Sequence, residues 1–246
     1  MAIPRKRLDD LLVKQELAST LQAARALILA GSVFVNQQRV DKPGTQVNPS
    51  SEISLRGKPS KYVSRGGLKL EAAIDTFEVG VRGHTCLDLG ASTGGFTDCL
   101  LKAGAAKVYS LDVGYGQLDY GLRQDPRVIP LERVNAHFPF QLPERIQMVT
   151  VDVSYISLLK VLPNVRTHLE SGHYILPLIK PQFEAQRRQV LRGGKVRDPK
   201  VHAVSIGRII SWATDAGLRV RNLTPAPITG KAGNQEFFIL LQSEDM

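Results

Sequence analysis

A glycine-rich turn between two acidic residues is the part of this sequence best suited to hold a ligand. Asp88 ends a short apolar run, the turn Gly90-Ala91-Ser92-Thr93-Gly94-Gly95 follows, and residues 96–103 have a helical pattern. Asp112 ends the next apolar run, 24 residues after Asp88. In doubly wound α/β domains, ligands bind beyond the carboxyl ends of the strands, and the second strand offers a carboxylate to ribose hydroxyls.

The details of the turn favour S-adenosylmethionine over a dinucleotide. A dinucleotide turn reads Gly-x-Gly-x-x-Gly, and its second glycine lets the backbone approach a pyrophosphate. Ser92 occupies that position here, and the Asp88 carboxylate would repel a pyrophosphate but can pair with an ammonium group. A nucleotide fold with another ligand is the alternative. The cofactor contacts expected from the sequence are Asp88, Gly90, Ser92, Gly94, Gly95, Phe96, Asp112 and, for adenine, Asn135.

Charged residues at two further strand ends could carry out catalysis. Asp152 ends the strand predicted over 147–152, and Lys180 follows the strand predicted over 173–179. A lone charge of this kind is usually solvated or part of a structural ion pair. Two at adjacent carboxyl ends favour a functional site. Lys69, in the helix predicted over 67–77, and Glu236, which begins the last strand, are further candidates.

The residues near Asp152 indicate which atom would receive a methyl group. Methylation of an exocyclic amine calls for an Asn/Asp-Pro-Pro-aromatic loop, but the sequence reads Asp152-Val153-Ser154-Tyr155. Methylation of carbon calls for a cysteine near the fourth or fifth strand, where none occurs. A ribose hydroxyl is therefore the better target. Because it is a poor nucleophile, a lysine amine must orient it or accept its proton.

The elements that must position these residues alternate between strand and helix from residue 66 onward. The last strand follows the sixth too closely for a helical crossover, so it must pair antiparallel. The pattern predicts an α/β fold with a Rossmann-like, seven-stranded, mostly parallel sheet of the methyltransferase type. Strands are expected at 84–89, 107–112, 127–131, 147–152, 173–179, 219–223 and 235–241. Helices are expected at 67–77, 96–103, 117–122, 155–168 and 199–216.

Residues 1–60 are predicted to form a separate, small α+β domain, and residues 61–246 the larger domain. The polar run at 56–61 is the expected linker. The first 60 residues contain nine Lys and Arg against five Asp and Glu, which makes their positive charge denser than that of the rest. A second basic segment spans residues 186–200. The basic residues that could bind the backbone of a nucleic acid such as RNA are Arg5, Lys6, Arg7, Lys14, Arg25, Arg39, Arg187 and Arg188. For the segment at 186–200, a solvated loop is the alternative.

Composition points to a cytoplasmic protein with a polyanionic partner. The 246 residues carry a net charge of +9 with 43% hydrophobic residues, and no apolar run is long enough to span a bilayer. No secretion signal opens the sequence. Cys86 and Cys99 are expected to be small core residues, and we predict no metal site.

The sequence resembles the TlyA-type haemolysin-like family, in which an RNA-binding module of the alpha-L type precedes an FtsJ-like methyltransferase. The resemblance covers nearly the whole chain. It rests on Arg7-Leu8-Asp9, Gly31-Ser32-Val33-Phe34-Val35-Asn36, Lys42-Pro43, residues 62–70, the turn at 88–96, Asp152-Val153-Ser154-Tyr155-Ile156-Ser157 and Ile179-Lys180-Pro181-Gln182-Phe183-Glu184.

The resemblance implies 2'-O-methylation of cytidine in ribosomal RNA by a Lys-Asp-Lys-Glu tetrad, here Lys69, Asp152, Lys180 and Glu236. The partners would be ribosomal RNA or ribosomal subunits, with no membrane required. Two residues depart from the family pattern: Leu21 replaces an arginine, and Gln37 replaces a glycine. A non-enzymatic RNA-binding factor and a membrane-lytic protein are the alternatives.

Overall fold

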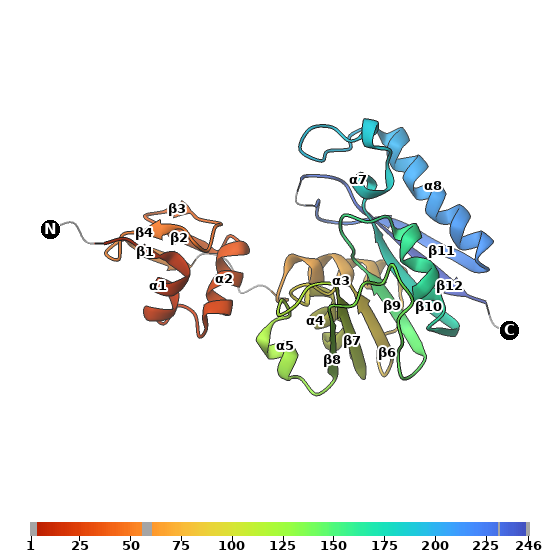
Figure 1. The fold of residues 1–246 in the computed structure, drawn as a ribbon, viewed down its shortest axis with the longest axis horizontal. Helices are drawn as coiled ribbons and strands as arrows, with labels where there is room; N and C mark the ends of the chain where they lie inside the picture. Colours follow the sequence, from red (N-terminus) through yellow and green to blue (C-terminus); the bar gives the residue numbers. More distant parts are fainter. Residues whose placement is uncertain (1–3, 56–60, 231, 245–246) are drawn as a thin grey trace. The chain divides into compact units, whose positions relative to one another are not determined.

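The structure, a computed structural model, describes residues 4–55, 61–230 and 232–244 (Figure 1). The chain divides into two compact units, Met1–Arg65 and Gly66–Met246. Apart from Lys61, the linker expected at 56–61 lies outside the described residues. Within those residues, no helix is both long and apolar enough to cross a membrane.

The first unit packs two helices against short strands. Leu8, Leu12 and Ile28 are fully buried between the helices, which explains the helical spacing of leucines in this region. Two-residue strands pair β1 with β4, and a second sheet has the order β3-β2-β5. The elements are β1 (Lys6–Arg7), α1 (Leu8–Lys14), α2 (Leu21–Leu29), β2 (Val33–Val35), β3 (Gln38–Arg39), β4 (Gln46–Val47) and β5 (Ile53–Leu55).

The two residues that depart from the family pattern lie on the surface of this unit. Leu21 is the first residue of α2, and the Thr20 hydroxyl before it caps the helix by accepting from the Ala23 N–H at 3.1 Å. Asn36 and Gln37 both have positive φ, 48° and 67°, in the turn between β2 and β3. Glycine adopts that conformation without strain, so Gln37 holds the turn at a conformational cost.

The second unit contains the predicted seven-stranded sheet, in the order β11-β12-β10-β9-β6-β7-β8 (Figure 1). β12 pairs antiparallel with β10 and β11, and the other pairs are parallel, as the sequence predicts. The strands are β6 (Thr85–Leu89), β7 (Lys107–Asp112), β8 (Val128–Glu132), β9 (Ile146–Val151), β10 (Leu169–Ile179), β11 (Leu218–Pro225) and β12 (Phe237–Ser243).

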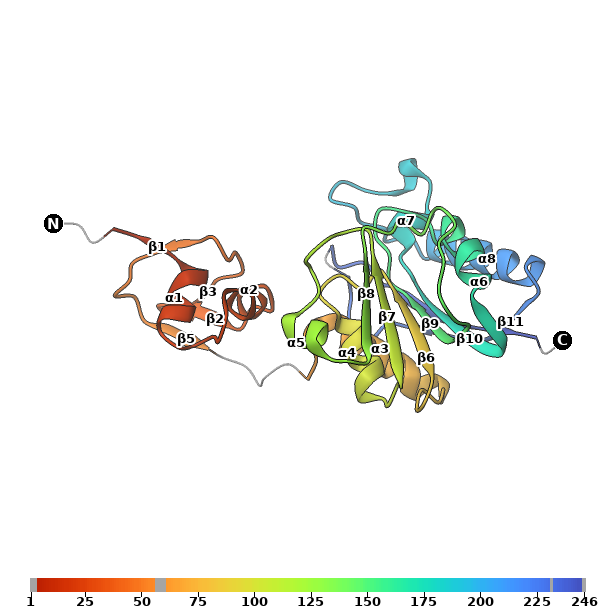
Figure 2. The ribbon, with the colours of Figure 1, turned by 60° about the horizontal axis from the view of Figure 1, so that its bottom comes forward.

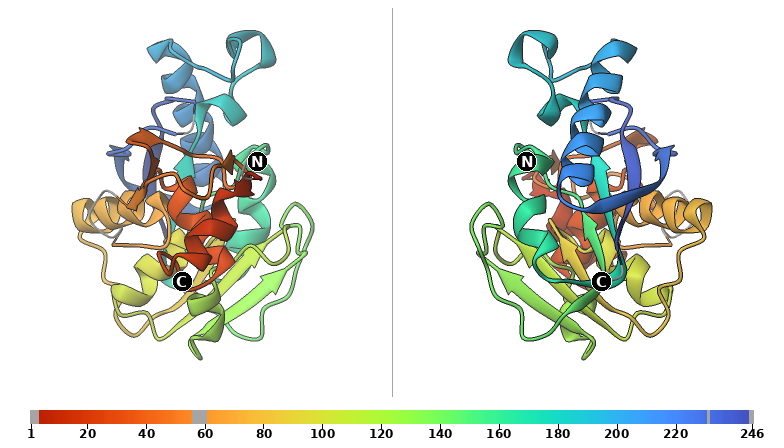
Figure 3. Two further views of the ribbon diagram at one scale, coloured as in Figure 1. Left: turned by 90° about the vertical axis from the view of Figure 1, so that its left-hand side faces the viewer. Right: turned by 90° about the vertical axis from the view of Figure 1, so that its right-hand side faces the viewer.

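Helices cover both faces of this sheet (Figures 2 and 3). Leu87, Leu89 and Val149 pack with residues of α6 and α8 in one core cluster. On the opposite face Phe96 of α4 lies against Phe238 of β12, with ring centroids 5.9 Å apart. The helices are α3 (Arg65–Phe77), α4 (Gly95–Lys102), α5 (Tyr120–Gln124), α6 (Leu162–Arg166), α7 (Pro181–Glu184) and α8 (Pro199–Asp215), with 3-10 turns η1 (Leu158–Lys160) and η2 (Arg187–Gln189).

One predicted helix is largely wrong. Residues 155–168 were expected to be a single helix, but only η1 and α6 are helical there. Tyr155 has a φ of +64°, which a continuous helix cannot contain. The Leu158 N–H is bound by the Glu184 carboxylate at 2.7 Å, so a tertiary contact fixes where helical structure begins.

Candidate active site

The carboxyl ends of β6, β7, β9 and β10 lie at one edge of the sheet because these strands run parallel. Leu89 pairs with Leu111 on one side and with Val151 on the other, and the Asp152 N–H continues the ladder to the Leu89 carbonyl at 2.9 Å. The residues that follow these strands are therefore neighbours. This edge carries the expected site.

Two glycines shape the turn after β6. Gly90 has a φ of +87°, and a Cβ there would lie 2.6 Å from the Asp152 carbonyl oxygen. Only glycine allows the β6 turn and the end of β9 to approach this closely. Gly94 has a φ of +94° and directly precedes α4, and a Cβ on Gly94 would lie 2.3 Å from the Leu122 side chain. Gly95 is the first residue of that helix.

Asp112, which the sequence suggests as the ribose-binding carboxylate, ends β7 and contacts two turns. Its Oδ2 accepts from the Ser92 N–H at 2.8 Å, and its Oδ1 accepts from the Gly114 N–H at 2.7 Å. Each carboxylate oxygen has further acceptor capacity, and the side chain is only half-buried. The carboxylate thus links the β6 and β7 turns while it can still receive hydroxyl groups. These residues fit the adenosine part of the expected cofactor.

Asp88 and Phe96 are buried in the protein rather than presented at its surface. The Asp88 carboxylate is fully buried and accepts from the Thr97 hydroxyl at 2.7 Å and the Thr150 hydroxyl at 3.2 Å. Burial raises the pKa of Asp88 to about 7. Phe96 is 3% exposed and packs on Phe238. The predicted direct contact of Asp88 with an ammonium group therefore has no open approach in this structure, because the carboxylate is enclosed by its threonine partners.

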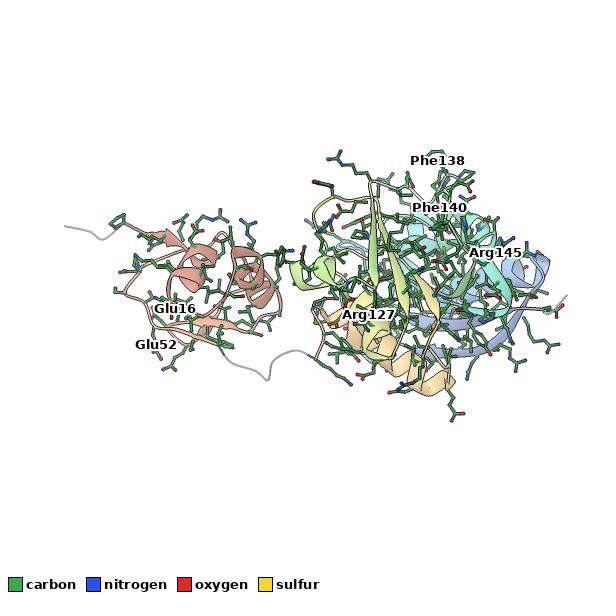
Figure 4. The ribbon with its side chains drawn as sticks, turned by 90° about the horizontal axis from the view of Figure 1, so that it is seen from below. Glu16, Glu52, Arg127, Phe138, Phe140 and Arg145 are labelled. Atoms are coloured by element: carbon green, nitrogen blue, oxygen red, sulfur yellow. The ribbon has the colours of Figure 1, made fainter. Side chains whose placement is uncertain are left out.

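The turn after β8 contains the residue expected near adenine. Asn135 is exposed, and its side-chain oxygen accepts from the His137 N–H at 3.0 Å. Further along this segment Phe138 is 60% exposed, whereas Phe140 stacks on His168 with centroids 4.5 Å apart (Figure 4). The segment is thus anchored by Phe140 and offers polar groups at Asn135.

Lys180 and Asp152 form an ion pair at the ends of β10 and β9. Lys180 Nζ lies 2.5 Å from Asp152 Oδ1, an ion pair rather than an aligned hydrogen bond, and donates to Ser154 Oγ at 3.0 Å. The lysine side chain is 11% exposed and the aspartate 25%. An ammonium group has three donors. Asp152 and Ser154 occupy two directions around Nζ, and one direction remains for a further acceptor.

Lys69 and Glu236 form a second pair beside the first. Lys69 Nζ, from α3, donates to Glu236 Oε2 at 2.6 Å, and the glutamate side chain is 3% exposed. Phe237 pairs with Ile179 in the antiparallel ladder of β12 and β10, so Glu236 lies opposite Lys180 in register. The four charged residues expected to act together are thus gathered as two lysine–carboxylate pairs.

Two buried polar residues near these pairs were missed by the sequence analysis. Glu184, 4% exposed, accepts from the Ser157 hydroxyl at 2.5 Å and the Leu158 N–H at 2.7 Å. It ties α7, which follows Lys180, to the loop that follows Asp152. Asn234, 2% exposed, accepts from the Val196 N–H at 2.8 Å and donates to the Gly194 carbonyl at 2.7 Å. It fastens the basic segment to the turn before Glu236.

An aromatic pair, one exposed ring and one half-buried ring, adjoins the Lys180 pair. Tyr155 is 92% exposed, and its ring centroid lies 5.3 Å from that of Phe183. Lys180 Nζ lies 5.9 Å from the centroid of Phe183. The left-handed backbone of Tyr155 is unfavourable for a bulky residue, and such strain is concentrated at functional sites. The sequence contains no local signal that would reveal this conformation.

The residues expected to bind RNA are all exposed, on two separate parts of the chain. Arg187 and Arg188 lie in η2, close in sequence to Lys180. The others belong to the first unit: Arg5, Lys6, Arg7, Lys14, Arg25 and Arg39.

The fold and the arrangement of the candidate site are those of a methyltransferase, and comparison with known proteins supports that class. The chain belongs to the FtsJ-like methyltransferase family, which residues 62–243 match, and residues 6–53 match the S4 domain. The family resemblance stated from the sequence is confirmed.

Two relatives and one solved structure resemble the chain over nearly all of its length. YqxC of Bacillus subtilis is 47% identical over 98% of this chain and 87% of its own. The 16S/23S rRNA (cytidine-2'-O)-methyltransferase TlyA of Mycobacterium tuberculosis is 41% identical over 98% of this chain and 91% of its own. A solved structure whose title names a hemolysin from Streptococcus thermophilus is 40% identical to this chain with a TM-score of 0.77. The match covers 99% of this chain and 90% of that protein's chain.

Proposed function

We propose that this protein transfers a methyl group from S-adenosylmethionine to the ribose 2'-hydroxyl of a cytidine in ribosomal RNA. The observation that carries the proposal is the pairing of Lys180 with Asp152 and of Lys69 with Glu236 at one sheet edge, next to the glycine turn. The rRNA cytidine-2'-O-methyltransferase activity named for the TlyA relative supports the substrate. Because ribosomal RNA is the substrate, the protein acts in the cytoplasm.

The residues around the glycine turn hold the cofactor. Asp112 accepts the ribose hydroxyls with the lone pairs that Ser92 and Gly114 leave free. Asn135 contacts the adenine, and the turn from Gly90 to Gly95 accommodates the amino-acid end. When bound, S-adenosylmethionine supplies an electrophilic methyl group on a positively charged sulfur. Asp88 acts here as a positioning residue, because it fixes α4 and β9 through Thr97 and Thr150.

Lys180 prepares the attacking oxygen. Methyl transfer forms one C–O bond and breaks one C–S bond, and the hydroxyl proton must be released. In its uncharged form Lys180 Nζ accepts a hydrogen bond from the hydroxyl, which fixes the direction of the oxygen, and takes the proton as the C–O bond forms. The lysine is then an ammonium group paired with Asp152. Asp152 and Ser154 hold Nζ in place. Lys69, held by Glu236, assists in positioning the same hydroxyl.

Two features of this edge suit an RNA substrate. The exposed ring of Tyr155 beside Phe183 offers a face on which a splayed nucleobase can stack. Arg187 and Arg188, which follow α7 in the sequence, supply positive charge for the RNA backbone, and the S4 domain supplies more.

Methyl transfer to separated ribosomal subunits tests the proposal. The protein is incubated with radiolabelled S-adenosylmethionine and each subunit, and the modified nucleotide is then mapped. We expect label on a cytidine ribose with the intact protein and none with Lys180→Ala. Binding of ribosomal RNA and of the cofactor without transfer would instead identify a non-enzymatic RNA-binding factor. Lysis of protein-free vesicles in place of transfer would identify a membrane-lytic protein.

A further inference from the structure

The surface of the first unit contains a carboxylate that is buried beneath two cationic side chains. Asp9 lies in the first turn of α1, and its side chain has no exposed area. Acidic residues are almost never fully buried unless they are paired. A buried acid in a module expected to bind a polyanion therefore calls for an explanation.

Asp9 holds two arginines at once. Arg7 Nε donates to Asp9 Oδ1 at 2.9 Å and Arg7 Nη2 donates to Oδ2 at 2.7 Å, so this contact is bidentate. Arg25 Nε, from α2, donates to the same Oδ2 at 3.0 Å. The Arg7 hydrogen bonds are the largest cause that lowers the pKa of Asp9 to about 2, so the carboxylate is charged at neutral pH.

Each arginine presents its remaining donors to solvent. The side chains of Arg7 and Arg25 are 45% and 49% exposed. A guanidinium has five N–H donors, and Arg7 uses two on Asp9 while Arg25 uses one. Two guanidinium groups this close repel each other unless a negative charge lies between them. Asp9 is that charge.

We propose that Arg7 and Arg25 form one binding site for a single phosphate of the RNA backbone and that Asp9 is the positioning residue that builds it. The inference rests on the proposed function, since it requires that the S4 domain bind RNA. Guanidinium groups match phosphate oxygens in shape and charge, and a fixed pair loses less conformational entropy on binding than two free side chains. Asp9, although negatively charged, thus improves binding of the RNA phosphate, because it fixes the two arginines that contact that phosphate.

The neighbouring Asp10 provides a matched control. Asp10 carries the same charge one residue later, but it is 57% exposed and lies 4.0 Å from Arg7. Long-range electrostatics alone predicts that Asp9→Asn and Asp10→Asn both tighten RNA binding, because each removes one negative charge. The proposed site predicts opposite signs for the two changes.

Binding of the full-length protein to purified ribosomal RNA, measured across a salt series, tests the site. We expect Asp9→Asn to weaken binding at least fivefold and to reduce the salt slope by about 0.7 to 1, the loss of one phosphate contact. Asp10→Asn should bind as tightly as the unchanged protein or a few-fold tighter. In a chain that already carries Arg7→Gln and Arg25→Gln, Asp9→Asn should no longer weaken binding. Binding by Asp9→Asn that equals or exceeds that of the unchanged protein would overturn the proposal.

A second set of variants keeps the test decisive if Asp9→Asn unfolds the module, as judged by thermal unfolding. Arg7→Gln, Arg25→Gln and the double variant are then compared. One shared site predicts that the double variant binds little worse than either single variant, and fully additive losses would overturn the shared site. Failure of the unchanged protein to bind ribosomal RNA at all would instead contradict the proposed function.

Discussion

Lys180 and Asp152 are 28 positions apart in the sequence, yet their charged atoms lie 2.5 Å apart. Asp152 follows the last residue of β9 and Lys180 that of β10, and these two strands are adjacent and parallel. Ser154 Oγ accepts a hydrogen bond from the same lysine nitrogen at 3.0 Å. The arrangement leaves Nζ fixed and partly accessible, which is what orientation of a weak nucleophile requires. A purely structural ion pair would need no open direction on its nitrogen.

The first prediction concerns catalysis by Lys180. Lys180→Ala should lose on the order of a hundredfold or more in single-turnover rate, the scale of general acid–base assistance, and should retain cofactor binding. Lys160→Ala, which removes an exposed lysine of η1, is the control and should leave the rate unchanged. A large loss of melting temperature with normal turnover of the remaining folded protein would identify a structural ion pair instead.

The second prediction concerns the ribose contact. Asp112→Ala should weaken binding of S-adenosylmethionine by ~1–3 kcal/mol, because hydrogen bonds to a charged acceptor are lost. Asp112→Asn keeps one acceptor oxygen and should lose less. Calorimetric titration measures both. Equal affinity of Asp112→Ala and the unchanged protein would contradict the assignment.

A third prediction follows from the buried carboxyl of Asp88. Its pKa is raised to about 7 in the folded protein, mainly by burial, against 3.8 for a solvated aspartate. The folded state therefore binds the proton more tightly, so this group's contribution to stability is full below about pH 4 and is lost as the pH rises through 7. Asp88→Asn should remove that decline. Between pH 5 and pH 8 the free energy of unfolding of the unchanged protein should fall by at least ~1 kcal/mol more than that of Asp88→Asn. Parallel pH–stability curves from chemical unfolding would disprove it.

Glu184 allows a fourth prediction. Glu184→Ala leaves the Ser157 hydroxyl and the Leu158 N–H without their buried acceptor and should destabilise the second unit by about 1–3 kcal/mol. Ser157→Ala removes only one of these donors and should cost less. Thermal unfolding of both variants gives the order, and a smaller loss for Glu184→Ala than for Ser157→Ala would show that the carboxylate does not anchor the loop.

The fifth prediction concerns the first unit. Removal of residues 1–60 should leave a folded protein that binds S-adenosylmethionine but methylates ribosomal RNA poorly, since the missing module contributes dense positive charge. Cofactor titration, melting and transfer rates are measured on the same sample. Full activity of the truncated protein on ribosomal RNA would show that the module is dispensable for substrate binding.

Regular patterns made most of the fold predictable from the sequence, and contacts between distant segments explain what was missed. Apolar runs that lead to Asp88, Asp112 and Asp152 in the sequence indicate a parallel sheet and the edge where its site is expected. The ion pair between Lys69 and Glu236 joins positions 167 residues apart, so no local pattern contains it.

The errors have the same physical origin. Helical structure in the segment expected to be one helix at 155–168 begins only at Leu158, where Glu184 forms tertiary hydrogen bonds. The burial of Asp88 was not predicted, because the two threonines that enclose its carboxylate lie in other elements. The strands β1 and β4 have two residues each, which is too short for any periodicity to appear.

The reversed direction of β12 has a practical consequence for anyone who wishes to label this protein. Glu236 precedes β12 and lies where β6, β9 and β10 end, so β12 runs away from that edge and finishes at Ser243 near the starts of its neighbours. A fluorophore or surface tether attached beyond Ser243 therefore emerges at the far rim of the sheet. Immobilisation through that end attaches the second unit at the end of its strands opposite to the lysine–carboxylate pairs.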